Sequence, residues 1–142
     1  MKIESNLILE LKKYKNEEKE AFYPKFFKTA KGEYGENDLF LGVSVPNSRK
    51  VSEKFQNLSL NELKQLIHYE IHEVRLCALL ILVKKYEYKY KEEKQNIENK
   101  KEIFEFYLEN LKGVNNWDLV DSSASKILGD YLKDKSKKEN II

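Results

Sequence analysis

VRLCALLILV, residues 74–83 of the chain, is apolar at every position but one. With its flanks, residues 71–85, it lacks the broad polar face that a surface helix presents to water. We therefore expect a helix that is buried on several sides. A helix of this kind occupies the centre of a stack, so the run predicts that other helices cover it.

Segments on both sides of this run have apolar residues at helical spacing. Five Gly and two Pro in 142 residues favour helices over a sheet protein with many turns. Residues 38–46 look like a short isolated strand, and we interpret them as an extended connector. The prediction is an all-α fold in a single domain, residues 1–142. The other predicted helices cover residues 3–14, 46–55, 59–67 and 117–132. A further helix has its charged start within residues 91–101, its apolar face over residues 103–111 and Gly113 as its C-terminal stop.

The charge balance is close to neutral, with 26 basic and 24 acidic residues and a formal net charge of +2. This charge is too small to indicate nucleic-acid binding by itself. The single cysteine, Cys77, excludes an internal disulfide and fits a reducing cytosol. The N-terminus lacks the apolar core of a signal peptide, and no run reaches the length of a membrane span. We therefore expect a cytoplasmic protein that has no membrane segment.

His68 and His72 stand four residues apart with Glu70 between them. The pattern suggests zinc, but the glutamate has the wrong offset for the metalloprotease helix motif. No third ligand is evident, and we expect a helix boundary between the two histidines. The sequence thus predicts no metal and no cofactor.

NNWDLVDS, residues 115–122, holds the only tryptophan. Either asparagine can cap a helix that places Trp117 and Asp121 one turn apart on one face. An aromatic ring beside an anion suits a cationic ligand that has a sugar or base to pack against. The plain alternative is that Trp117 belongs to the core and Asp121 is a surface or capping acid. A separate apolar stripe, predicted to anchor the helix, comprises Val120, Ala124, Ile127, Leu128 and Tyr131.

Several short segments, in the right order along the chain, resemble the DNA alkylation repair family of bacterial alkylpurine DNA glycosylases of the AlkD type. The resemblance covers about residues 23–132. It implies an α-α superhelix of HEAT-like antiparallel helix pairs, in which a concave face wraps duplex DNA. The matching segments are residues 26–36, residues 40–46 followed by Arg49 and Lys50, residues 117–121 and residues 128–130.

The resemblance also implies base-excision repair of double-stranded DNA. The reaction is hydrolysis of the N-glycosidic bond of cationic N3- or N7-alkylated purines. Asp121 is the implied catalytic anion, which stabilises an oxocarbenium-like transition state. Trp117 is expected to pack on the deoxyribose or the lesion.

A second implied contact is between the DNA backbone and the start of the helix at residue 46. The positive end of a helix is a ready phosphate site, and nearby basic side chains strengthen it. The plain alternative is an ordinary capped helix with solvated charges. The residues expected to contact DNA are Ser44, Val45, Pro46, Arg49, Lys50 and, in the preceding aromatic segment, Lys28.

The chain departs from the family pattern in one respect. Full-length members continue for several helices that carry a second catalytic-site tryptophan and an arginine, and this chain has neither there. We therefore expect a truncated array, the N-terminal part of a longer family domain, with weak or absent glycosylase activity alone. The alternative function is a non-catalytic HEAT-like scaffold that binds DNA or protein. Its exposed C-terminal end would support a dimer or a second polypeptide.

Overall fold

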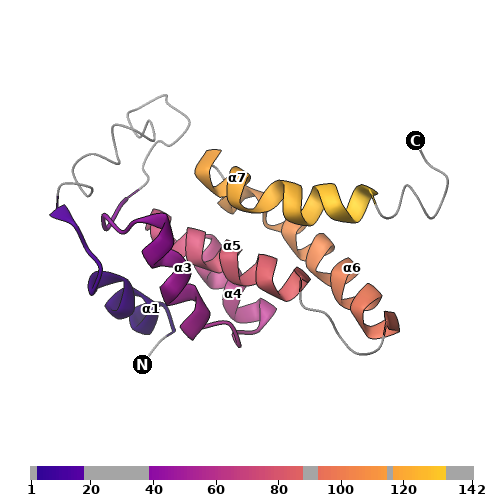
Figure 1. Ribbon diagram of the computed structural model, residues 1–142, viewed down its shortest axis with the longest axis horizontal. Helices are drawn as coiled ribbons and strands as arrows, with labels where there is room; N and C mark the ends of the chain where they lie inside the picture. Colours follow the sequence, from indigo (N-terminus) through magenta and orange to yellow (C-terminus); the bar gives the residue numbers. More distant parts are fainter. Residues whose placement is uncertain (1–2, 18–38, 88–92, 115–116, 134–142) are drawn as a thin grey trace.

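A computed structural model describes residues 3–17, 39–87, 93–114 and 117–133 (Figure 1). The side chains of residues 3–5, 93–99, 117–118 and 121–122 also lie outside this description. The helices within it are α1 Ile3–Lys12, α3 Val45–Lys54, α4 Leu60–Ile67, α5 His72–Glu87, α6 Glu93–Glu109 and α7 Trp117–Ala124. A 3-10 turn, Leu111–Gly113, follows α6, and a π-helical turn, Ser125–Gly129, continues α7.

The described residues form an all-α fold, as predicted. Residues 40–44 have no regular secondary structure, and Leu39 makes a single parallel bridge with Ile71. The interpretation as an extended connector is therefore confirmed for residues 39–44, whereas Val45 and Pro46 already belong to α3 and residue 38 lies outside the described residues.

Helix α5 lies at the centre of the fold and contacts α1, α3, α4, α6 and α7 (Figure 1). Every side chain from His72 to Val83 is buried, and so is Tyr86. Neighbouring helices on several sides leave no face of residues 72–83 for water, so this part of α5 needs no polar stripe. The central position predicted from residues 74–83 is confirmed.

Local capping chemistry fixes where α3 and α4 begin. The Ser44 hydroxyl accepts a hydrogen bond from the Asn47 N–H at 3.3 Å, and Pro46 stands in the first turn of α3. Ser59 and Glu62 form the predicted capping box at the start of α4. His68 caps the C-terminal end of α4, whereas His72 opens α5, so a helix boundary does separate the two histidines.

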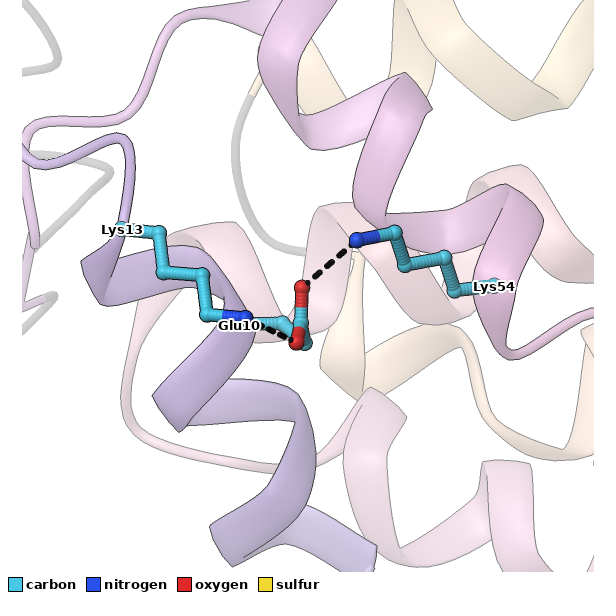
Figure 2. Close-up of polar contacts among 3 residues, drawn as sticks. All are labelled: Glu10, Lys13 and Lys54. Carbon is cyan, nitrogen blue, oxygen red and sulfur yellow. Dashed lines mark hydrogen bonds and ion pairs between the residues drawn. The ribbon is translucent and has the colours of Figure 1, made fainter.

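Helix α1 packs on the core through Leu7 and Leu11, which are fully buried. Figure 2 shows its polar edge, where the Glu10 carboxylate lies between Lys13 at 2.7 Å and Lys54 of α3 at 2.9 Å. The hydrogen bonds from these two ammonium groups, Lys13 first, lower the pKa of Glu10. Exposed ion pairs stabilise proteins little, so the buried leucines hold α1 in place.

Three details of the predicted helices are wrong. Helix α6 ends at Glu109, before Gly113, because the Asn110 side chain donates to the Phe106 carbonyl and the chain tightens into a 3-10 turn. The π-helical turn after α7 was not foreseen. The stripe that buries α7 is centred on Leu119, Ser123 and Ile127, while the other predicted stripe residues are only half-buried.

Candidate nucleic-acid interface

Helix α7 starts at Trp117, as predicted, and its first two turns contain Asp121. Leu119 and Ser123 are fully buried. Positions two residues apart lie about 200° apart around an α-helix, so positions 117 and 121 lie on the opposite side of the backbone from 119 and 123. The contacts of the Trp117 and Asp121 side chains lie outside the described residues and stay a prediction.

A buried hydrogen-bond chain fixes this register of α7. The hydroxyls of Tyr107, on α6, and Ser123 are 2.8 Å apart, and the Ser123 hydroxyl donates to the Leu119 carbonyl at 2.6 Å. Burial raises the pKa of Tyr107, against a smaller opposing effect of the bond to Ser123. A rotation of α7 would strand these buried polar atoms without partners, which costs free energy.

The π-helical turn that follows α7 lines a pocket of about 420 Å³ with Tyr86, Lys100, Ser125 and Asp130. Tyr86 donates a hydrogen bond to Asp130 at 2.8 Å, and Lys100 lies 3.6 Å from the same carboxylate and 5.1 Å from the centre of the Tyr86 ring. Ser125 is four residues after Asp121, so positions 121 and 125 are neighbours on one side of the helix. The pocket therefore begins about one helical turn from position 121.

A second pocket, of about 240 Å³, adjoins the first and shares Glu87 and Lys126 with it. Arg49 of α3 and Lys84 of α5 line its walls. We call the two pockets together the α5 groove, because both lie along the C-terminal half of α5 beside the turn after α7, the first next to α6 and the second next to α3.

The α5 groove carries three exposed cations beside the exposed carboxylates of Glu53 and Glu87. Four basic side chains and three carboxylates line it. Lys100 is held by Asp130, whereas Arg49, Lys84 and Lys126 are exposed and have no ion-pair partner within the described part of the chain. Exposed cations from three different elements can contact successive phosphates of a nucleic acid.

A family model described as DNA alkylation repair enzyme matches residues 7–142. The chain belongs to this family. The resemblance found in the sequence is thereby confirmed at the level of the family. No curated protein and no solved structure matches the chain significantly.

Fewer groups at the start of α3 are available to contact DNA than the resemblance implied. Pro46 has no N–H, and the N–H groups of Asn47 and Ser48 bond to Ser44 at 3.3 and 2.8 Å. Among the first amides of α3, the Val45 N–H is the one that neither of these bonds uses. The helix can therefore offer an anion this amide, the Ser44 hydroxyl and the positive end of its dipole.

The structure separates the remaining residues expected to contact DNA. Arg49 lies in the α5 groove, whereas the exposed Lys50 and Pro46 do not line it. Lys28 lies outside the described residues, as does the whole segment 26–36 that carried part of the resemblance.

Three residues of interest were not among the predicted site residues: Lys84 and Lys126, which line the α5 groove, and the buried Glu73, whose carboxylate accepts hydrogen bonds from the N–H groups of residues 41–43. In the sequence, Lys84 directly follows the apolar run of α5, and this position could have indicated it. In the structure its side chain lines the α5 groove. Nothing local distinguishes Lys126 from other surface lysines. Glu73 is an acid inside an otherwise apolar helix, and this contrast was the available signal.

The described residues contain no group of three His, Cys, Asp or Glu side chains that could hold a metal ion. His68 bonds instead to the Asn110 side chain at 2.8 Å, and the His72 ring stacks on Phe40. Within the same part of the chain, no helix combines the length and the apolar character needed to cross a bilayer.

Proposed function

We propose that the chain is a DNA glycosylase that hydrolyses the N-glycosidic bond of cationic N3- or N7-alkylated purines in duplex DNA. The observation that carries this proposal is the tryptophan–aspartate pair one turn apart at the start of α7, in a chain that belongs to the DNA alkylation repair enzyme family. Both positions lie on the side of α7 opposite its buried face, and Ser125, one turn after position 121, lines the α5 groove.

The chemistry needs little from the protein beyond a well-placed anion. An alkylated purine is already positively charged and leaves readily, and its departure creates positive charge on the deoxyribose. The Asp121 carboxylate stabilises that charge as it develops and orients the attacking water. Two unit charges about 4 Å apart interact by roughly 1–4 kcal/mol near a surface, which corresponds to about one to three decades in rate.

Trp117 and the α5 groove hold the damaged duplex against α7. The indole packs on the sugar or lesion, and its electron-rich face favours a cationic base. Arg49, Lys84 and Lys126 contact backbone phosphates, which fixes the register of the duplex without reading its sequence.

The test is single-turnover release of 7-methylguanine from duplex DNA, followed over long incubation times because we expect slow release by this chain alone, and measured together with salt-dependent binding to damaged and undamaged duplexes. Asp121→Asn should lower the release rate by about ten- to a thousandfold and leave binding to undamaged duplex almost unchanged. The matched control is Glu105→Gln, which removes an exposed carboxylate from α6 and should leave the release rate as it is.

Two results would overturn the proposal. Binding to duplex DNA without any base release, unaffected by Asp121→Asn, would identify a non-catalytic DNA-binding scaffold. Failure to bind either duplex at low salt would leave a helical scaffold for a protein partner.

A further inference from the structure

We propose that Glu73 is a positioning residue for DNA binding: its buried carboxylate holds the connector, residues 39–44, and thereby sets the start of α3 against the duplex. This inference rests on the proposed function, because it assumes that the start of α3 and Arg49 meet DNA. Glu73 itself is about 1% exposed and so cannot touch a ligand.

The carboxylate of Glu73 accepts three backbone hydrogen bonds from a segment thirty residues earlier in the chain. The N–H groups of Leu41, Gly42 and Val43 donate to it at 2.9, 2.9 and 3.0 Å. All three donors are buried, so without the carboxylate they would have neither water nor protein as partner. Three consecutive N–H groups on one carboxylate fix the path of the backbone through the connector.

The first turn of α5 holds the start of the same connector. The His72 N–H donates to the Leu39 carbonyl at 2.7 Å, and the Leu39 N–H donates to the Glu70 carbonyl at 3.2 Å. The Phe40 and His72 rings stack with their centres 4.7 Å apart. The connector is therefore attached to the central helix of the fold along most of its length.

Gly42 gives the connector its direction. Its φ angle is 83°, in the left-handed region that disfavours every residue with a Cβ atom. Its N–H donates to Glu73, and its carbonyl accepts from the Asn16 N–H at 3.0 Å. Ser44, two residues later, caps α3, so a change in the backbone at Gly42 is passed directly to the first turn of α3.

The chemistry of the side chain favours a positioning role over simple core filling. An apolar residue would fill the same space in α5 without the cost of burying a carboxylate. The benefit specific to a carboxylate is the fixed geometry of the connector and, through it, the placement of Ser44, the Val45 N–H and Arg49.

The experiment measures how the affinity for undamaged duplex DNA depends on salt concentration. Glu73→Gln keeps the shape of the side chain but replaces one accepting oxygen with an amide nitrogen that cannot accept. We expect its affinity to fall about five- to tenfold and the slope of log affinity against log salt to become shallower by about 1, as for one lost phosphate contact.

Two further variants separate positioning from stability. Leu82→Ala opens a cavity in the core of α5 away from the connector and should destabilise the fold without changing the salt slope. Gly42→Ala disturbs the connector while the Glu73 side chain stays unchanged, and it should reproduce the shallower slope, so the inference remains testable if Glu73→Gln does not fold.

The outcomes distinguish the two proposals. If the native chain binds duplex DNA, and Glu73→Gln or Gly42→Ala keeps the native salt slope, the positioning role of Glu73 is wrong while the proposed function stands. If the native chain does not bind duplex DNA at all, the proposed function fails and this inference fails with it.

Discussion

Cys77 lies fully buried in α5, where its thiol donates to the Ser48 carbonyl of α3 at 3.5 Å. Burial raises the pKa of this thiol far above its ordinary value of 9.0, and the negative charge of Glu73 raises it further. The thiolate is the reactive form of cysteine, so the environment that packs Cys77 also makes it inert.

Cys77 should report on unfolding. A thiol-specific reagent at mildly alkaline pH should label the folded chain only as fast as the structure opens, and labelling should become rapid in denaturant. Because the folded thiol keeps its proton where the unfolded thiol loses it, its contribution to stability should decline as the pH rises above 9.0. Labelling at the rate of a free thiol without denaturant would contradict this account.

The contribution of Glu10 to stability, at the edge between α1 and α3, should have the opposite pH dependence. The lowered pKa of its carboxyl means that its contribution is present above the ordinary value of 4.5 and is lost as the pH falls through the folded-state value. Thermal melts of the native chain and Glu10→Gln should therefore differ slightly at neutral pH and converge as the pH falls below the lowered pKa of Glu10. A difference that grows in acid would show that the ion pairs in Figure 2 do not contribute as described.

At the scale of the secondary-structure element, local sequence and tertiary contacts control different properties of α7. Its start follows from local signals, whereas its rotation about its own axis follows from contacts with α5 and α6. Leu119, Ser123 and Ile127 form its buried face. This rotation decides which side of the helix remains for a ligand.

Two leucines in this helical segment test the rotation. Leu119→Ala should lower the free energy of unfolding by about 2–5 kcal/mol, because it opens a cavity at a fully buried position. Leu132→Ala makes the same substitution where the side chain is 53% exposed and should cost well under half as much. Denaturant melts of both variants provide the measurement, and equal losses would refute the assigned register.

The hydrogen bond between Tyr107 of α6 and Ser123 of α7 provides a second test of the α7 register. Tyr107→Phe removes one hydroxyl and leaves the Ser123 hydroxyl with the Leu119 carbonyl as its remaining partner. We expect a loss of about 1 kcal/mol in the free energy of unfolding, with little change in the packing of the ring. The control is Phe104→Leu, at a half-buried position of α6 whose ring stacks on Tyr131; it removes no hydrogen bond and should cost no polar penalty.

At the scale of the whole molecule, the α5 groove depends on three elements at once. Arg49 comes from α3, Lys84 from α5 and Lys126 from the turn after α7. These residues are far apart in the sequence and meet only because α3 and α7 both pack on α5. The near-neutral composition of the whole chain does not indicate that these three cations lie together.

The groove cations should contribute separately to DNA affinity. Replacement of Arg49, Lys84 or Lys126 by Gln should make the salt slope of duplex binding shallower by about 1 each, with similar losses for unrelated sequences. The control is Lys64→Gln, which removes an exposed lysine from α4 outside the groove. Equal effects at all four positions would indicate that net charge, rather than this groove, governs binding.

The sequence by itself determined the helical class, the central place of α5, the starts of α3, α4 and α7, and the family. These features depend on residues close together in the sequence, namely apolar runs, capping residues and short motifs, and local chemistry is enough to fix them. The tertiary structure alone decided the register of α7, the cations that line the α5 groove and the attachment of the connector to Glu73. Each depends on residues that are distant in the chain and adjacent only after packing, where burial decides which atoms must find partners.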